Sequence, residues 1–256
     1  MPVARRRATF GAALIVAGAM AACGGGGAPE ERTVPVAPTV SPVSAETAGR
    51  IVGVVRLEGT PPPPEAVQMN SDPYCVDEGG VPTPAFVTGG NGELQHVFVY
   101  VKDGLGDLRF PVPETPVLLD QKGCVYHPHV FGIQVGQILE ILNSDSTLHN
   151  VHAIPENNRE FNRAHATAGI SHTHVFSTSE VMVPFKCNVH NWMTAYVGVL
   201  DHPFHSVSGA DGTFRLDGLP PGTYTIEAWH ETLGTDTQTV TIGEREQQDL
   251  AFTFTL

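Results

Sequence analysis

Basic residues are scarce in this sequence. Lys and Arg number 14 against 27 Asp and Glu, which gives a formal net charge of −13 over 256 residues. Binding to a nucleic-acid backbone requires a basic surface, so nucleic acid is not an expected partner. No Ser-His-Asp order, phosphate-binding glycine loop or carboxylate pair stands out. The sequence therefore gives no support for hydrolytic chemistry, and we do not expect an enzyme.

Long helical periodicities are also scarce, whereas the chain contains 27 Gly and 21 Pro. Short runs rich in β-branched residues recur between these turn-forming residues, a pattern typical of strands. One segment, 155–171, has no clean period and is expected to be a loop with a helical turn. The pattern predicts an all-β protein built as a β-sandwich, with strands at 51–57, 97–101, 116–119, 131–135, 137–142, 174–176, 181–185, 195–199, 225–229, 237–241 and 249–255.

The apolar run at the N-terminus, residues 10–22, is too short to span a bilayer comfortably. It follows three arginines, which is the layout of a secretory signal peptide over residues 1–22. The run ends in Met20-Ala21-Ala22-Cys23-Gly24, which resembles a bacterial lipobox. The resemblance implies cleavage before Cys23, lipidation of its sulfur, and a membrane-anchored lipoprotein on the periplasmic or cell-surface side. A plain signal peptide with an incidental cysteine is the alternative.

Residues 23–49 are expected to be the lipidated cysteine and a flexible tether. Four glycines are followed by a run of Pro, Val, Ser, Thr and Ala that cannot bury enough apolar surface to fold. Roughly 25 extended residues at about 3.1 Å each could hold a domain up to ~75 Å from a membrane.

Two short stretches carry the side chains of a metal site. Cys187, His190 and Met193 follow one another at Cys-x2-His-x2-Met spacing, and a second imidazole upstream comes from His149 or His152. One thiolate, two imidazoles and a weak thioether form the ligand set of a blue-copper electron-transfer site, because these groups suit both Cu(I) and Cu(II). Closed structural zinc sites use two or more cysteines, and a dinuclear copper centre needs a second cysteine in the loop. Neither condition is met.

The paired motifs resemble the cupredoxins, in particular those of the amicyanin and plastocyanin type. In that family the His directly before Asn is the ligand, which favours His149 in Leu148-His149-Asn150, and Asn150 would brace the ligand loops by hydrogen bonds. The resemblance implies a cupredoxin-like Greek-key β-sandwich, placed at residues 50–200. It implies one type 1 copper, with ligands His149, Cys187, His190 and Met193.

After residue 200 the sequence pattern changes. The run Gly-x-Phe-x-Leu-x-Gly-Leu-Pro-Pro-Gly-Thr-Tyr, residues 212–224, resembles the carboxypeptidase regulatory-like, transthyretin-type β-sandwich. Residues 201–256 are fewer than a whole sandwich needs, so we expect this smaller module to pack against, or share strands with, the copper domain. A hairpin with a turn at Asp211-Gly212 is expected across residues 207–214.

The four cysteines can all be assigned. With Cys23 assigned to lipid and Cys187 to metal, Cys75 and Cys124 remain. Disulfides persist in exported proteins, so we predict a Cys75–Cys124 disulfide.

The remaining histidines leave a second copper site open, at His127 with His129 or at His172 with His174. Trp192 lies between two ligands, where it either forms part of an apolar docking face or fills a gap against the second module. Both readings of Trp192 stay open at this point.

The predicted function is an exported blue-copper protein that transfers single electrons between periplasmic redox partners. Because the chain is acidic, a basic c-type cytochrome is one partner that would fit. The alternative is a copper delivery or storage lipoprotein that uses the additional histidines. A third, more remote hypothesis is a structural surface module without redox turnover.

Overall fold

The structure is a computed structural model that describes residues 43–63, 66–70, 72–79 and 84–256. The chain divides into two units, Met1–Ala37 and Pro38–Leu256, and the described residues all belong to the second. The signal peptide, Cys23 and most of the tether fall outside the described residues, so those predictions stay predictions. No helix in the described part has the length and apolar character needed to cross a membrane.

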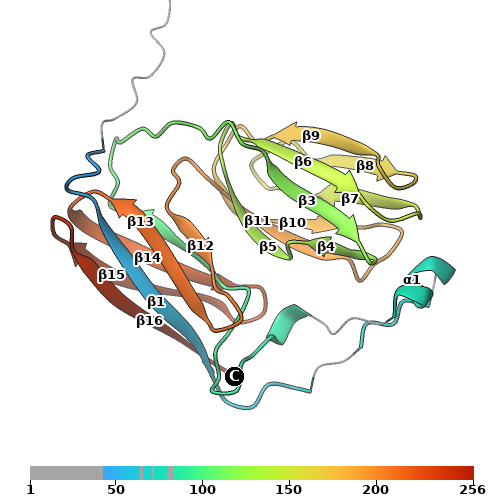
Figure 1. Cartoon of the computed structure of the whole chain (residues 1–256), viewed down its shortest axis with the longest axis horizontal. Coiled ribbons are helices and arrows are strands. Elements are labelled where there is room, and N and C mark those ends of the chain that lie inside the picture. The colour runs from blue at the N-terminus through green and yellow to red at the C-terminus, as the bar shows by residue number, and fades with distance from the viewer. Residues whose placement is uncertain (1–42, 64–65, 71, 80–83) are drawn as a thin grey trace, which may run out of the picture. The chain divides into compact units, whose positions relative to one another are not determined.

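The all-β prediction is confirmed, because strands make up most of the described structure (Figure 1). The two short helical elements are α1 (Pro73–Glu78) and the 3-10 turn η1 (Pro84–Phe86). The strands are β1 (Gly49–Glu58), β2 (Phe98–Asp103), β3 (Val117–Lys122), β4 (Val125–His127), β5 (Val130–Gln134), β6 (Ile138–Asn143), β7 (His149–Ala153), β8 (Phe161–His165), β9 (Ser171–Val175), β10 (Glu180–Lys186), β11 (Thr194–Leu200), β12 (His205–Val207), β13 (Thr213–Leu219), β14 (Gly222–His230), β15 (Gly234–Ile242) and β16 (Gln247–Thr255).

One sandwich combines the start and the end of the described chain. Its sheets have the orders β13-β1-β16 and β12-β2-β14-β15. In Figure 1, β1 runs between β13 and β16, antiparallel to the first and parallel to the second. Phe214, Leu216 and Leu219 of β13 are buried, and with apolar residues of β1, β2, β14 and β16 they form one hydrophobic core. Burial of one face of each sheet is what holds the two layers together.

Strand pairing moves the boundary between the modules away from residue 200. β1 and β2 lie before that residue, yet they pair with β13, β16, β12 and β14, which lie after it. Residues 201–256 alone would lack β1, the strand that lies between β13 and β16 and pairs with both. The smaller module therefore shares strands with the preceding segment, and the other sandwich is inserted between β2 and β12.

The hairpin expected across residues 207–214 is wrong. The tight turn is present, because Gly212 N–H donates to the carbonyl of Gly209 at 2.9 Å. The strands on either side pair elsewhere, however: β12 with β2, and β13 with β1. The turn carries the chain from one sheet of the sandwich to the other.

The inserted sandwich has sheets of order β5-β11-β10-β7-β8 and β4-β3-β6-β9. Its core is a second cluster of buried apolar residues drawn from both sheets. The loop with a helical turn expected at 155–171 is wrong, because β8 forms there and pairs antiparallel with β7. This strand lies at the sheet edge, and its three central residues are exposed, so it has no apolar alternation to mark it.

Sheet order brings the predicted ligands to one place. β7 begins at His149, β10 ends just before Cys187, and β11 begins just after Met193. β7 and β10 are antiparallel neighbours, so the start of one lies beside the end of the other. The upstream histidine and the ligand loop therefore meet at the same end of the five-stranded sheet.

Two glycines allow the sandwiches to pack closely. Gly132 on β5 and Gly198 on β11 are paired across the sheet. A Cβ atom at Gly198 would lie 2.3 Å from the Phe98 ring, and one at Gly132 would lie 2.3 Å from the His205 ring. These two rings stack on each other with centroids 5.6 Å apart. The Phe98 and His205 rings therefore pack directly against the backbone of Gly198 and Gly132.

Replacement of Gly198 by Ala should destabilise the fold. The added methyl group collides with the Phe98 ring, and overpacking of this kind typically costs about 1–3 kcal/mol in the free energy of unfolding. Urea unfolding measures the change. The control is Gly90→Ala, where a Cβ meets nothing within 4 Å. Equal stability of the two variants would contradict the tight packing at Gly198.

Candidate metal centre

Three of the predicted ligands lie together in the interior. Ligand atoms of His149, Cys187 and His190 all lie within 4.8 Å of one another, and all three side chains are buried. The fourth, Met193, is 1% exposed and belongs to the same apolar core as Cys187. The structure thus places all four residues in one buried region at the end of the sheet.

The ligand loop is closed by its own backbone. Cys187 N–H donates to the carbonyl of Met193 at 3.1 Å, and Met193 N–H donates to the carbonyl of His190 at 3.0 Å. The N–H of His190 points at the Cys187 sulfur, 3.3 Å away. These bonds fix the short loop and also supply a donor to the thiolate that a metal site needs.

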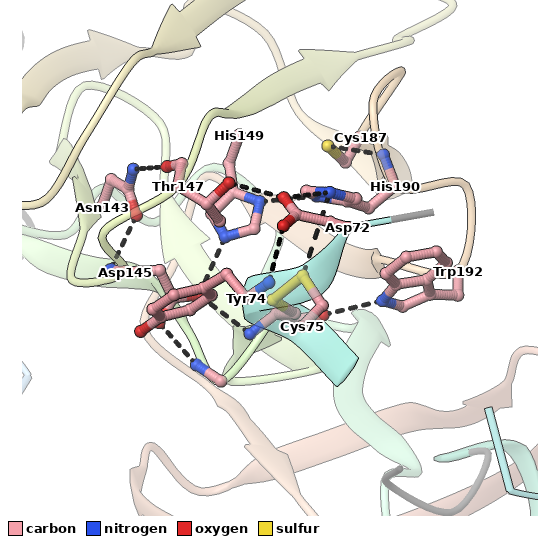
Figure 2. The surroundings of a disulfide bond; sticks show 12 residues. Asp72, Tyr74, Cys75, Asn143, Asp145, Thr147, His149, Cys187, His190 and Trp192 are labelled. Carbon is pink, nitrogen blue, oxygen red and sulfur yellow. Dashed lines mark hydrogen bonds and ion pairs between the residues drawn. A yellow bond between two sulfur atoms is a disulfide. The ribbon is translucent and has the colours of Figure 1, made fainter. Parts of the chain in front are cut away.

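Each imidazole is held by a carboxylate through Nε2. His149 Nε2 lies 2.8 Å from Asp145 Oδ2, and His190 Nε2 lies 3.2 Å from Asp72 Oδ2 (Figure 2). An ionised carboxylate oxygen only accepts, so both Nε2 atoms must donate. The Nδ1 atoms of the two rings face each other at 2.9 Å. Two facing lone pairs at this distance require a cation between them, either a proton or a metal ion.

The shift in the pKa of Cys187 suits a metal ligand, whereas the shift at His149 favours a proton on the ring in the absence of a metal. Burial disfavours a charged His149, but hydrogen bonds with Cys187 and Asp145 outweigh burial and raise its pKa. Burial likewise disfavours a Cys187 thiolate, but hydrogen bonds from His149 and from the backbone lower the pKa of the thiol. For Asp72, the hydrogen bond from Thr147 is the main cause of a lowered pKa. Sulfur in its thiolate form is the form that binds metals.

Asn150 connects the two ligand-bearing segments. Its Oδ1 accepts the backbone N–H of Asn188 at 2.7 Å and lies 3.4 Å from the Cys187 sulfur. Its Nδ2 donates to Oδ1 of Asn162 on the neighbouring strand β8 at 2.7 Å. These contacts are of the bracing kind that the cupredoxin resemblance implies.

The predicted Cys75–Cys124 disulfide is confirmed, and it lies beside the centre. The Cys75 sulfur is 3.9 Å from His190 Nε2. Trp192 packs in the same place, with its Nε1–H donating to the carbonyl of Cys124 at 2.9 Å and its ring 5.0 Å from that of His190. These contacts of Trp192 are with the disulfide segment and His190, where a gap against the C-terminal module was one of the two expectations; a role in docking stays a prediction.

Two residues of the centre escaped the sequence analysis. Asp145 stands four residues before His149, so a carboxylate at this spacing was a signal that could have been used. Asp72 had no such signal, because it lies 118 residues from His190 along the chain. The Asp72-Pro73 pair is recognisable only as a helix start, and Asp72 does cap α1 by accepting the N–H of Tyr74.

In the histidine pairs that left a second copper site open, His129 and His172 have other partners. Groups of three or more metal-binding side chains in the described part of the chain all contain His149 or His190. His129 lies between the carbonyl of Thr194 and the Glu231 carboxylate, and His172 Nδ1 lies 2.6 Å from His165 Nε2. His152, the rejected ligand, lies 2.6 Å from Glu160.

A family model matches one part of the chain. Residues 194–256 match the carboxypeptidase regulatory-like domain. The predicted resemblance of the C-terminal segment is thereby confirmed. No curated protein matches the chain significantly.

Solved structures similar to the chain include cupredoxins. A Cu(I) form of an amicyanin variant is 18% identical over 34% of this chain and 85% of its own, with a TM-score of 0.30. A purple cupredoxin from Nitrosopumilus maritimus is 24% identical over 32% of this chain and 98% of its own, with a TM-score of 0.28. A copper-containing nitrite reductase from Thermus scotoductus is 19% identical over 37% of this chain, with a TM-score of 0.33. This chain spans 24% of that reductase.

Replacement of Asn150 by Ala should loosen the ligand loop. It removes the acceptor of the part-buried hydrogen bond from the Asn188 N–H, and the loss of one such bond typically costs about 0.5–1.5 kcal/mol in the free energy of unfolding. Urea unfolding of the metal-free protein measures this cost. The control is Asn162→Ala, which removes only the bond to Nδ2 of Asn150 and should cost less. A smaller effect at Asn150 than at Asn162 would contradict the bracing role.

Proposed function

We propose that this chain binds one copper ion as a type 1 blue site and transfers single electrons between periplasmic redox partners. The observation that carries the proposal is the convergence of His149, His190 and Cys187 in one buried cluster. Both imidazoles have their Nε2 atoms held by carboxylates, so their Nδ1 atoms are left for a cation. The donor set therefore fits copper, with Met193 as the weak fourth ligand.

Copper supplies the one-electron change when it is bound, and the chain supplies a fixed environment. Thiolate and thioether sulfurs suit Cu(I), while imidazole suits both oxidation states. The loop bonds between Cys187 and Met193, and the bonds of Asn150, hold the ligands before any metal arrives. Preorganised ligands change little between the two states, which favours rapid electron exchange.

The location of the protein is part of the same proposal. The signal peptide and the lipobox ending at Cys23 support export and membrane attachment as a lipoprotein. The tether would let the copper domain reach partners away from the membrane. The formal charge of −13 supports encounter with a basic redox protein such as a c-type cytochrome.

The Cys187→Ser variant tests the site. Copper-loaded wild-type protein should show an intense thiolate-to-copper band in the visible spectrum and a narrow copper hyperfine splitting in EPR. Both features should be absent from the variant, because the serine hydroxyl is a poor copper ligand. His152→Ala is the matched control and should keep both features. A weak copper spectrum that is the same in wild type and Cys187→Ser would exclude the blue site.

A copper titration separates electron transfer from delivery or storage. An electron carrier should bind one copper per chain and cycle reversibly between oxidation states without losing it. Delivery or storage predicts more than one copper per chain, or ready loss of Cu(I) to a competing chelator. The measurements are metal content after gel filtration, voltammetry, and chelator competition.

A further inference from the structure

The two carboxylates at the centre come from different parts of the chain. Asp145 lies in the loop between β6 and β7, close to His149 in sequence. Asp72 caps α1, which belongs to neither sandwich and is fastened by the Cys75–Cys124 disulfide to the turn between β3 and β4. Figure 2 shows this segment lying against the His190 ring.

Asp145 is fixed by four contacts besides the one to His149. Its Oδ1 accepts the N–H of Gly123 at 2.8 Å and lies 3.3 Å from the Tyr74 hydroxyl. Its Oδ2 accepts the N–H of Cys124 at 2.8 Å, and its own N–H donates to Asn143. The residue is 2% exposed, so this carboxylate has no freedom to turn away from the histidine.

Asp72 is fixed in a comparable way. Its Oδ2 accepts the Thr147 hydroxyl at 2.5 Å and the Nε2–H of His190, while its Oδ1 accepts the N–H of Tyr74 at 2.8 Å. Thr147 precedes His149 by two residues, so Asp72 also joins the α1 segment to the loop that carries the other histidine ligand. Within the residues that the structure describes, α1 belongs to no sheet, so the disulfide is its covalent link to the centre beside these hydrogen bonds.

We propose that Asp72 and Asp145 are positioning residues that fix both imidazoles with Nδ1 toward copper, and that the disulfide keeps Asp72 in place over His190. This inference rests on the proposed copper site. A carboxylate that accepts a hydrogen bond from the other ring nitrogen of a histidine ligand sets the ring's tautomer and orientation and raises its basicity. Two negative charges beside the metal also stabilise Cu(II) more than Cu(I), which lowers the reduction potential.

Substitutions at Asp72 in the copper-loaded full chain test the inference. Asp72→Ala should weaken copper binding about 10- to 100-fold, the usual cost of losing such a partner. Asp72→Asn keeps an oxygen that can accept from Nε2, so its affinity should lie between those of Asp72→Ala and wild type. Both variants should raise the reduction potential. Chelator competition measures affinity, and a spectroelectrochemical titration measures the potential.

The matched control is Asp77→Asn, an equal change of charge on the exposed side of the same helix. It should leave the affinity unchanged and the potential close to that of wild type. Asp72 variants that behave like Asp77→Asn in both measurements would overturn the inference. If wild-type protein gives no blue spectrum at all, it is the proposed function that fails, so the two failures are distinguishable. Unfolding of the metal-free variants shows whether each one is folded.

A double-mutant cycle tests whether the Cys75–Cys124 disulfide keeps Asp72 in place over His190. Cys75→Ser/Cys124→Ser should reproduce the loss of affinity and the raised potential of Asp72→Ala. Combining it with Asp72→Ala should add little, because both changes remove the same contact to His190. Fully additive effects, or a disulfide-free protein with wild-type affinity and potential, would show that the disulfide does not act through Asp72.

Discussion

Two buried imidazoles whose Nδ1 atoms lie 2.9 Å apart, with both Nε2 atoms committed to carboxylates, need a shared cation. The surrounding structure is arranged around this requirement. Strand order brings the two histidines together, the closed loop holds the Cys187 sulfur beside them, and Asn150 connects the two segments. Burial opposes ionisation of the Cys187 thiol, but hydrogen bonds from His149 and the backbone lower its pKa, which favours the thiolate form.

The His190 ring is covered by other parts of the chain. His190 is 1% exposed, because α1, the disulfide and Trp192 pack against its ring. In an electron carrier, a partner would meet this cover and not the bare ring. Electron transfer would then pass through this cover.

The relation between the two sandwiches is a consequence of strand pairing. The sandwich that holds the His-Cys-His cluster is inserted between β2 and β12 of the C-terminal module, so both ends of the insertion are held by one sheet. The glycines at positions 132 and 198 allow close contact between the modules. Glu231 of the C-terminal module also reaches His129, whose other nitrogen faces the carbonyl of Thr194, directly after the ligand loop. The C-terminal module therefore supports the far end of that loop.

The amino-acid sequence by itself predicted the side chains that meet in the buried cluster, the all-β class and the disulfide partners. It could do so because metal-ligand spacing, β-branched runs and the number of cysteines are local or compositional properties. It did not reveal the edge strand β8, whose exposed face lacks alternation, nor the assignment of β1 and β2 to the C-terminal module. The sequence did not indicate the role of Asp72 either, because that role depends on a contact with His190, 118 residues away along the chain. Only the tertiary structure could decide these features, because pairing at a sheet edge and closure by a disulfide depend on long-range geometry.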